Sequence, residues 1–194
     1  MSETLSTPAI SLRCRPFKEH DLLAEVYTLE HGKISLMVKG GRRLSSKLAA
    51  HLEPLTLLEL MVIRGKGMPA AAAASSRNCY PLLKGDFDKI EVAGRVIGDF
   101  SRLVHEELRD DRLFHLLSDF FAILNEAKAE TKWYEWFGNL FLALVLDHLG
   151  HGRALDNLPN SLYEAVHFKI SRKDLEKTNS HLKKWLQKTI ANAL

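Results

Sequence analysis

The stretch LLAEVYTLEHGKISLMVKGGRR at residues 22–43 decides the fold. In its second half Ile34, Leu36 and Val38 alternate with more polar or flexible residues, which is the two-residue period of a strand. The first half, residues 22–29, is a second run rich in strand-forming residues. The turn at Gly32 brings the chain back, so the stretch predicts an antiparallel hairpin.

Working outward from the hairpin, further short strands are predicted on both sides. Residues 10–15 alternate and end at Pro16, and residues 55–63 form a longer apolar run before the glycine-containing turn at 64–67. Residues 70–74 are all alanine, the best helix former, yet a barrel needs a closing strand here. We therefore expect five strands in a small closed barrel.

After Pro81 the apolar period changes from two residues to about 3.6, which places a domain boundary near residue 83. We expect a barrel domain over residues 1–83 and a helical domain over 84–194, an α+β protein. The first helix should bury a stripe spaced by three and four residues, made of Phe87, Ile90, Ala93, Ile97, Phe100, Val104 and Leu108. Helices should follow over 112–126 and 131–149, the latter capped by Thr131, then one after Pro159 and one capped by Ser171.

Bulk composition excludes several classes of protein. A hydrophobic content of 46% over 194 residues supports a folded core. The apolar run at 140–146 is too short to span a bilayer and the first ten residues do not resemble a signal peptide, so a cytoplasmic protein without a membrane partner is expected. Cys14 and Cys79 are isolated and predict neither a disulfide framework nor a zinc site.

Positive charge is concentrated in the first part of the chain. Residues 1–84 hold 12 Lys and Arg against 7 Asp and Glu, whereas the rest holds 15 against 17. Lys39-Gly-Gly-Arg-Arg43, followed by Lys47, combines glycines that admit close anion approach with side chains that match phosphate oxygens. Standing alone, such a loop is more simply a solvated hairpin tip, but the second basic turn at Arg64 and Lys66 favours a polyanionic partner.

Other polar clusters support ordinary structural roles better than catalysis. No GxxxxGK[ST] or GxGxxG motif is present, and no serine has the partners of a nucleophile, so no enzymatic activity and no cofactor are expected. His148 and His151 have a spacing compatible with a metal but are most simply helix-end residues. The acids at 106–107 and 110–111 favour a solvated face and a helix break over acid–base work. The aromatic run from Trp133 to Phe141 is core packing or, alternatively, a pocket for a partner peptide.

The sequence resembles the RecO family of recombination mediators along most of its first domain. The residues that carry the resemblance are Arg15-Pro16-Phe17, His31-Gly32-Lys33, Val38-Lys39-Gly40-Gly41-Arg42-Arg43, residues 52–60 and Arg64-Gly65-Lys66-Gly67, with weaker matches at residues 86–90 and Leu149-Gly150-His151. The resemblance implies an OB-fold that binds single- and double-stranded DNA and anneals strands. It also implies a role in helping RecA replace single-strand binding protein, usually with RecR.

Two departures from the family's pattern qualify what the resemblance implies. Residues 152–159 lead directly into the last helices where many members carry a four-cysteine zinc module, so no metal is expected. Asn139 stands where the family tends to have a basic residue that helps hold the acidic tail of single-strand binding protein, although Phe141 preserves the apolar part of that pocket.

These observations lead to two hypotheses of function. The first is a DNA-binding and annealing mediator whose phosphate-binding residues are Arg13, Arg15, Lys33, Lys39, Arg42, Arg43, Lys47, Arg64 and Lys66. The second is an adaptor that acts mainly through the helical domain, where Trp133, Trp136, Phe137 and Phe141 would hold a partner peptide or a RecR-like subunit.

Overall fold

The computed structural model describes residues 3–152, 154, 156, 158–167 and 171–193. It divides into two compact units, and each is built from two parts of the chain. The barrel unit comprises Met1–Tyr80 with Val104–Ser118, and the helical unit comprises Pro81–Leu103 with Asp119–Leu194. The sequence indicated a boundary near residue 83 but gave no sign that a later segment would pack with the barrel.

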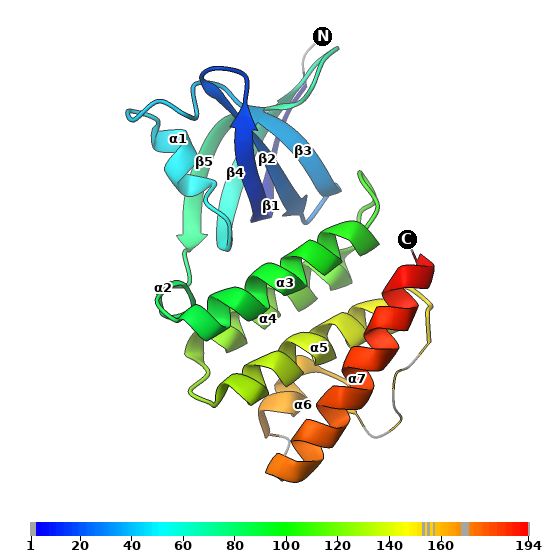
Figure 1. Ribbon diagram of the computed structural model, residues 1–194. Helices are drawn as coiled ribbons and strands as arrows, with labels where there is room; N and C mark the ends of the chain where they lie inside the picture. The colour runs from blue at the N-terminus through cyan, green and yellow to red at the C-terminus, as the bar shows by residue number, and fades with distance from the viewer. Residues whose placement is uncertain (1–2, 153, 155, 157, 168–170, 194) are drawn as a thin grey trace. The chain divides into compact units, whose positions relative to one another are not determined.

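The barrel unit has five strands, labelled in Figure 1. They are β1 (Glu3–Phe17), β2 (Asp21–Thr28), β3 (Gly32–Val38), β4 (Thr56–Arg64) and β5 (Ala70–Asn78). They close in the order β1-β2-β3-β5-β4, with β3 and β5 parallel at Met37 and Ala70. The predicted α+β class with a five-stranded N-terminal barrel is confirmed.

The long strand β1 serves both sides of the barrel. Its first part pairs with β4 and its second part with β2, and the pairing register with β2 shifts between Ser11 and Arg13. A register shift bends a strand, which lets one strand turn the corner of a small barrel. Inward-facing residues of all five strands form the core, including Val26, Leu36 and Leu60.

The alanine run forms β5, as the barrel required. Ala71 is buried and Ala72 and Ala73 are exposed, so the run lies in a sheet with two different faces. Backbone pairing with β4 runs from Ala70 to Asn78 with a register shift at Ala72, and this pairing overrides the helical preference of alanine. A short helix, α1 (Lys47–His51), was not predicted; its N-cap is Ser46, whose side chain accepts a hydrogen bond from the Ala49 amide.

The helical unit contains α2 (Pro81–Lys84), α3 (Phe87–Leu103), α5 (Thr131–His148), α6 (Leu162–His167) and α7 (Arg172–Ala193). The remaining helix, α4 (Asp111–Glu126), begins in the barrel unit and ends in the helical unit. Within the helical unit α5 packs against both α3 and α7 (Figure 1). None of the helices among the described residues is long and apolar enough to cross a bilayer.

Close packing of α3 on α5 depends on Gly138. A Cβ atom at this position would lie 2.7 Å from Cγ1 of Val92 and 3.1 Å from Cγ2 of Val96. The ring of Phe120 on α4 stacks on Phe137 at 5.4 Å and meets Phe141 at 4.7 Å between centroids. Aromatic side chains therefore fill the centre of this unit.

Several helix predictions need correction. The first helix ends at Leu103, and Phe87 and Leu108 of the expected buried stripe are 78% and 58% exposed. Ala93, Ile97, Phe100 and Val104 are buried as predicted. The buried face also includes Lys89, Val92 and Val96, because the apolar spacing on this helix fits more than one face and the contact with α5 selects among them. Thr131 is the first helical residue rather than the cap, whereas Ser171 caps α7 by accepting a hydrogen bond from the Asp174 amide at 3.2 Å.

Candidate nucleic-acid interface

The basic loop after β3 is held in shape by its own backbone. The Gly41 amide donates to the Val38 carbonyl at 3.1 Å, and the Arg43 amide donates to the Gly40 carbonyl at 3.0 Å. Gly40 has a φ of +63°, a region that side chains disfavour. The loop is thus ordered without using the side chains of Lys39, Arg43 or Lys47, all of which are exposed.

Arg42 has a different role, because it fastens this loop to the β1–β2 turn. Its backbone amide donates to the His20 carbonyl at 2.9 Å, and its Nη1 donates to the carbonyls of Glu19 at 2.9 Å and Lys18 at 3.3 Å. The Gly40 amide donates a hydrogen bond to a carboxylate oxygen of Asp21 at 2.8 Å. Arg42 is therefore mainly a positioning residue, although its side chain is exposed.

The junction of these two loops brings predicted residues together at one end of the barrel, and it adds one that the sequence analysis missed. Lys18 is exposed in the β1–β2 turn with its Nζ 5.5 Å from the ring centroid of Phe17. Its φ of +54° is a tertiary feature with no signature in the sequence. Lys18, Lys39, Arg42 and Arg43 lie in the two joined loops, and Lys47 begins the helix that follows; together they are called the loop cluster below.

Arg13 and Arg15 lie on the outward face of β1, as predicted. Both are exposed, whereas Leu12 and Cys14, which alternate with them along the strand, are buried and half-buried. Arg13 pairs across the strands with Glu25, and Arg15 pairs with Leu23. The acid opposite Arg13 offsets part of its charge, so Arg15 is the better placed of the two for an anion.

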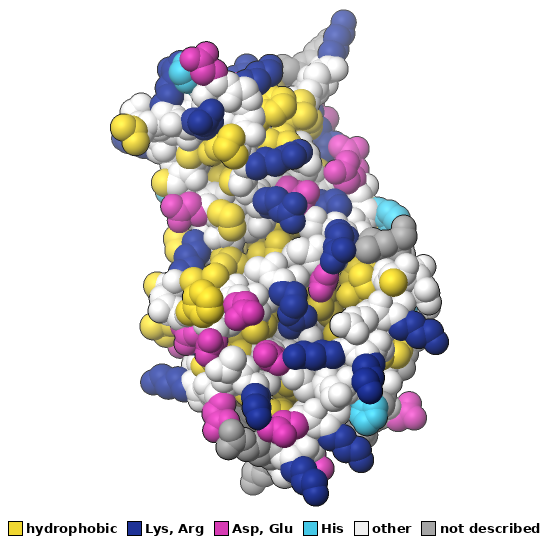
Figure 2. All heavy atoms as spheres, viewed as in Figure 1, with side chains coloured by type: hydrophobic (Ala, Val, Ile, Leu, Met, Phe, Trp, Pro, Cys, Tyr) yellow, Lys and Arg dark blue, Asp and Glu magenta, His cyan; other side chains and the backbone are white. Residues whose placement is uncertain are grey.

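Lys33 and Arg64 have acidic surroundings that the sequence did not indicate. The Arg64 side chain is 26% exposed, and its Nη2 lies 3.4 Å from a carboxylate oxygen of Glu107. Lys33 is half-buried, and its carbonyl accepts a hydrogen bond from the Glu107 amide at 2.9 Å. Lys66, in the β4–β5 turn, is exposed. Figure 2 shows Lys and Arg side chains distributed over the visible face, with apolar and acidic side chains among them.

The aromatic residues predicted to contact a partner are mostly internal. Trp136, Phe137 and Phe141 are completely buried, and half-buried Trp133 stacks on Phe137 at 4.8 Å between ring centroids. A partner peptide could not reach the three buried rings without separating the helices. The expectation of a peptide pocket lined by these side chains is therefore wrong for Trp136, Phe137 and Phe141, and core packing accounts for them.

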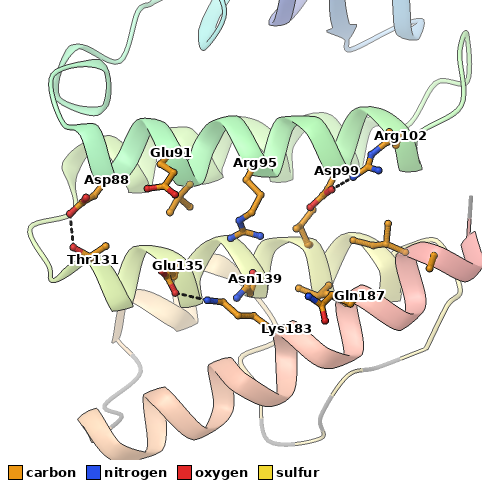
Figure 3. A pocket seen from close by; sticks show the side chains of 15 residues that line it. Asp88, Glu91, Arg95, Asp99, Arg102, Thr131, Glu135, Asn139, Lys183 and Gln187 are labelled. Atoms are coloured by element: carbon orange, nitrogen blue, oxygen red, sulfur yellow. Dashed lines mark hydrogen bonds and ion pairs between the residues drawn. The ribbon is translucent and has the colours of Figure 1, made fainter.

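A groove of about 680 Å³ does exist in the helical unit, between α3, α5 and α7. Figure 3 shows Arg95 pointing from α3 toward Asn139, and Lys183 of α7 pairing with Glu135 at 2.7 Å. Its floor includes apolar side chains such as Leu142. The charged residues that line it are Asp88, Glu91, Arg95, Asp99, Arg102, Glu135 and Lys183. Charge in the groove is thus mixed rather than strongly of one sign.

No metal site is formed by the described residues, in which no three His, Cys, Asp or Glu side chains gather. The stretch 152–159, from which the sequence analysis drew its expectation of no metal, contains residues 153, 155 and 157, which lie outside the described part of the chain.

Comparison with known proteins links the barrel to one family. Residues 1–80 match the family model described as "Recombination protein O N terminal". The chain is 26% identical over 155 residues to DNA repair protein RecO of Geobacter metallireducens, covering 80% of this chain and 62% of the relative. The corresponding protein of Clostridium perfringens is 25% identical over 154 residues, covering 79% of this chain and 61% of the relative.

A third relative is similar at a higher identity over a slightly shorter stretch. DNA repair protein RecO of Heliobacterium modesticaldum is 30% identical over 143 residues, which cover 74% of this chain and 50% of the relative. The chain thus spans about six tenths or less of the length of these three relatives.

Proposed function

We propose that this chain, which belongs to the RecO family of DNA repair proteins, binds DNA through the loop cluster at one end of its barrel. The observation that carries the proposal is an ordered loop whose backbone bonds leave Lys39, Arg43 and Lys47 exposed. Among the described residues none of these three side chains forms an ion pair. Such cations are available to neutralise phosphates.

The same surface supports an annealing function. Two complementary strands repel one another, and a surface that neutralises the phosphates of both lowers that repulsion. On this account the protein is a mediator and carries out no chemistry of its own. It acts on single- and double-stranded DNA, works with a RecR-like subunit, and assists RecA indirectly on DNA covered by single-strand binding protein. A mediator of this kind would act in the cytoplasm, where these partners are.

The test is a DNA-binding measurement on a variant with Lys39, Arg43 and Lys47 all changed to alanine. Arg42 is left in place because its loss would release the β1–β2 turn. Each phosphate contact contributes about 0.7 to 0.9 to the slope of log affinity against log salt, so the slope should fall by about two to three. Affinity for both DNA forms and the rate of strand annealing should fall together.

A matched control removes the same charge from exposed positions of the helical unit, through Lys128, Lys177 and Lys188 changed to alanine. This control should retain most of the affinity and slope of the wild-type protein. Equal losses in the two triple variants, or a wild-type affinity that does not change between 50 and 200 mM salt, would contradict the proposal.

The groove of the helical unit supports a second function, that of an adaptor for a partner peptide. The groove has apolar side chains on its floor and the cations Arg95 and Lys183 along its sides. This combination suits a peptide with both apolar and acidic side chains, such as the tail of single-strand binding protein. Glu135 offsets Lys183, and Asn139 is buried with its amide donating to Asn179, which weakens that match. A pull-down after nuclease treatment separates the two functions, since an adaptor keeps its partner without DNA.

A further inference from the structure

An acidic segment at residues 105–111, which follows α3 and includes the first residue of α4, belongs to the barrel unit, whereas α3 up to Leu103 belongs to the helical unit. Glu106 forms an isolated parallel bridge with Lys33 at the start of β3. The Glu107 amide donates to the Lys33 carbonyl at 2.9 Å. The segment therefore follows the edge of β3 through backbone pairing, which fixes where its carboxylates lie.

The contact is close enough to demand particular backbone conformations. A Cβ atom on Gly32 would lie 2.0 Å from the Leu108 carbonyl oxygen, a distance that no side chain can occupy. Glu107 itself has a φ of +55°, which is unfavourable for a residue other than glycine. An unfavourable backbone conformation of this kind persists only where tertiary contacts impose it. The contact with β3 therefore sets the backbone position of Glu107.

The carboxylate of Glu107 faces a basic residue of the barrel, Arg64. Glu107 lies 3.4 Å from Nη2 of Arg64, and the Arg64 side chain is 26% exposed against 63% for Glu107. Nε and Nη2 of Arg64 are buried and make no hydrogen bond to any described residue. Glu107 thus offsets the charge of Arg64 but accepts no hydrogen bond from its Nε or Nη2. A phosphate that approached Arg64 would first meet the carboxylate of Glu107, which is the more exposed of the two side chains.

We propose that Glu106 and Glu107 limit the DNA-binding surface at the start of β3, so that Arg64 is withheld from DNA and strands bind only toward the loop cluster. This inference rests on the proposed function. On this proposal the predicted phosphate-binding residues fall into two groups. Those around Lys39 and Arg43 can contact DNA, whereas Arg64 is kept from DNA by the neighbouring carboxylate.

A double-mutant cycle tests the inference, using Glu107→Gln, Arg64→Ala and the two combined. Glutamine keeps the shape of the side chain and removes its charge, so Arg64 should become available to one more phosphate. Affinity for single-stranded DNA should rise, and the salt slope should steepen by about 0.7 to 0.9, which makes the gain about threefold larger at 50 mM than at 200 mM salt. Arg64→Ala alone should leave the salt slope unchanged, because Arg64 contacts no phosphate in the wild-type protein, and the combined variant, which keeps the wild-type net charge of the pair, should match the wild-type protein.

Glu53→Gln serves as the control for net charge, because Glu53 is an exposed acid of the same unit outside the acidic segment. The inference fails if Glu53→Gln gives the same gain, if Glu107→Gln gives none, or if its gain persists without Arg64. A salt slope that becomes flatter by about 0.7 to 0.9 in Arg64→Ala alone also overturns it, and this arm does not depend on the stability of Glu107→Gln. A failure of the loop-cluster experiment instead would contradict the proposed function itself.

Discussion

Replacing Gly32 by alanine should destabilise the contact between β3 and the acidic segment. The new Cβ would lie 2.0 Å from the carbonyl oxygen and 2.6 Å from the carbonyl carbon of Leu108, both backbone atoms that cannot rotate away. The φ of +63° at Gly32 adds about 1–2 kcal/mol for a residue with a side chain. Overpacking adds about 1–3 kcal/mol, so the barrel unit should lose roughly 2–5 kcal/mol.

Gly40→Ala is a matched control, because Gly40 has the same φ of +63° but its nearest contact would be the flexible Arg43 side chain at 3.6 Å. It should show only the conformational cost. Hydrogen exchange measures both effects: amides of the barrel strands report the stability of the unit, and the Glu107 amide reports the bond to Lys33. Equal destabilisation by the two alanines, with the Glu107 amide still protected in Gly32→Ala, would refute the reasoning.

Three further predictions concern the core, the cysteines and pH. Phe141→Ala should lower the stability of the helical unit by about 3–5 kcal/mol, measured by urea unfolding with tryptophan fluorescence, since all three tryptophans lie in that unit. Burial raises the pKa of the Cys14 thiol to about 11, so at pH 8 a thiol reagent should label exposed Cys79 rapidly and Cys14 slowly, and Cys79→Ser should remove the fast phase. A hydrogen bond from Lys183 lowers the pKa of Glu135, so this pair stabilises the helical unit fully above the ordinary value of 4.5 and progressively less as pH falls through the lowered value.

The last two predictions have direct controls. The ion pair is partly exposed, so its contribution should be about 0.2–1 kcal/mol, and Glu135→Gln should lose less stability than the wild-type protein when the pH is lowered. An identical acid response in the two proteins would contradict that assignment. Two thiols that react at the same rate in the folded protein would contradict the burial of Cys14.

The barrel could be predicted from sequence because its signals are local. Alternation at Ile34, Leu36 and Val38 and the glycine turn at Gly32 depend only on neighbouring residues, and the loop glycines stand beside their basic side chains. The helical half was predicted in outline for the same reason. The buried face of α3 was predicted only in part, since Phe87 and Val92 are both apolar and only the contact with α5 decides which is covered.

The candidate interface shows where local information ends. The sequence alone determined which side chains are basic and that glycines accompany them. Only the tertiary structure decided which of these charges are available: Arg42 is bonded to the β1–β2 turn, and Arg64 lies beside Glu107, which is 43 positions away along the chain. Electrostatic interaction depends on distance in space, which the order of residues along the chain does not reveal. The pairing that brings Glu107 to β3 also requires a glycine at position 32, where the sequence pattern indicates only a turn.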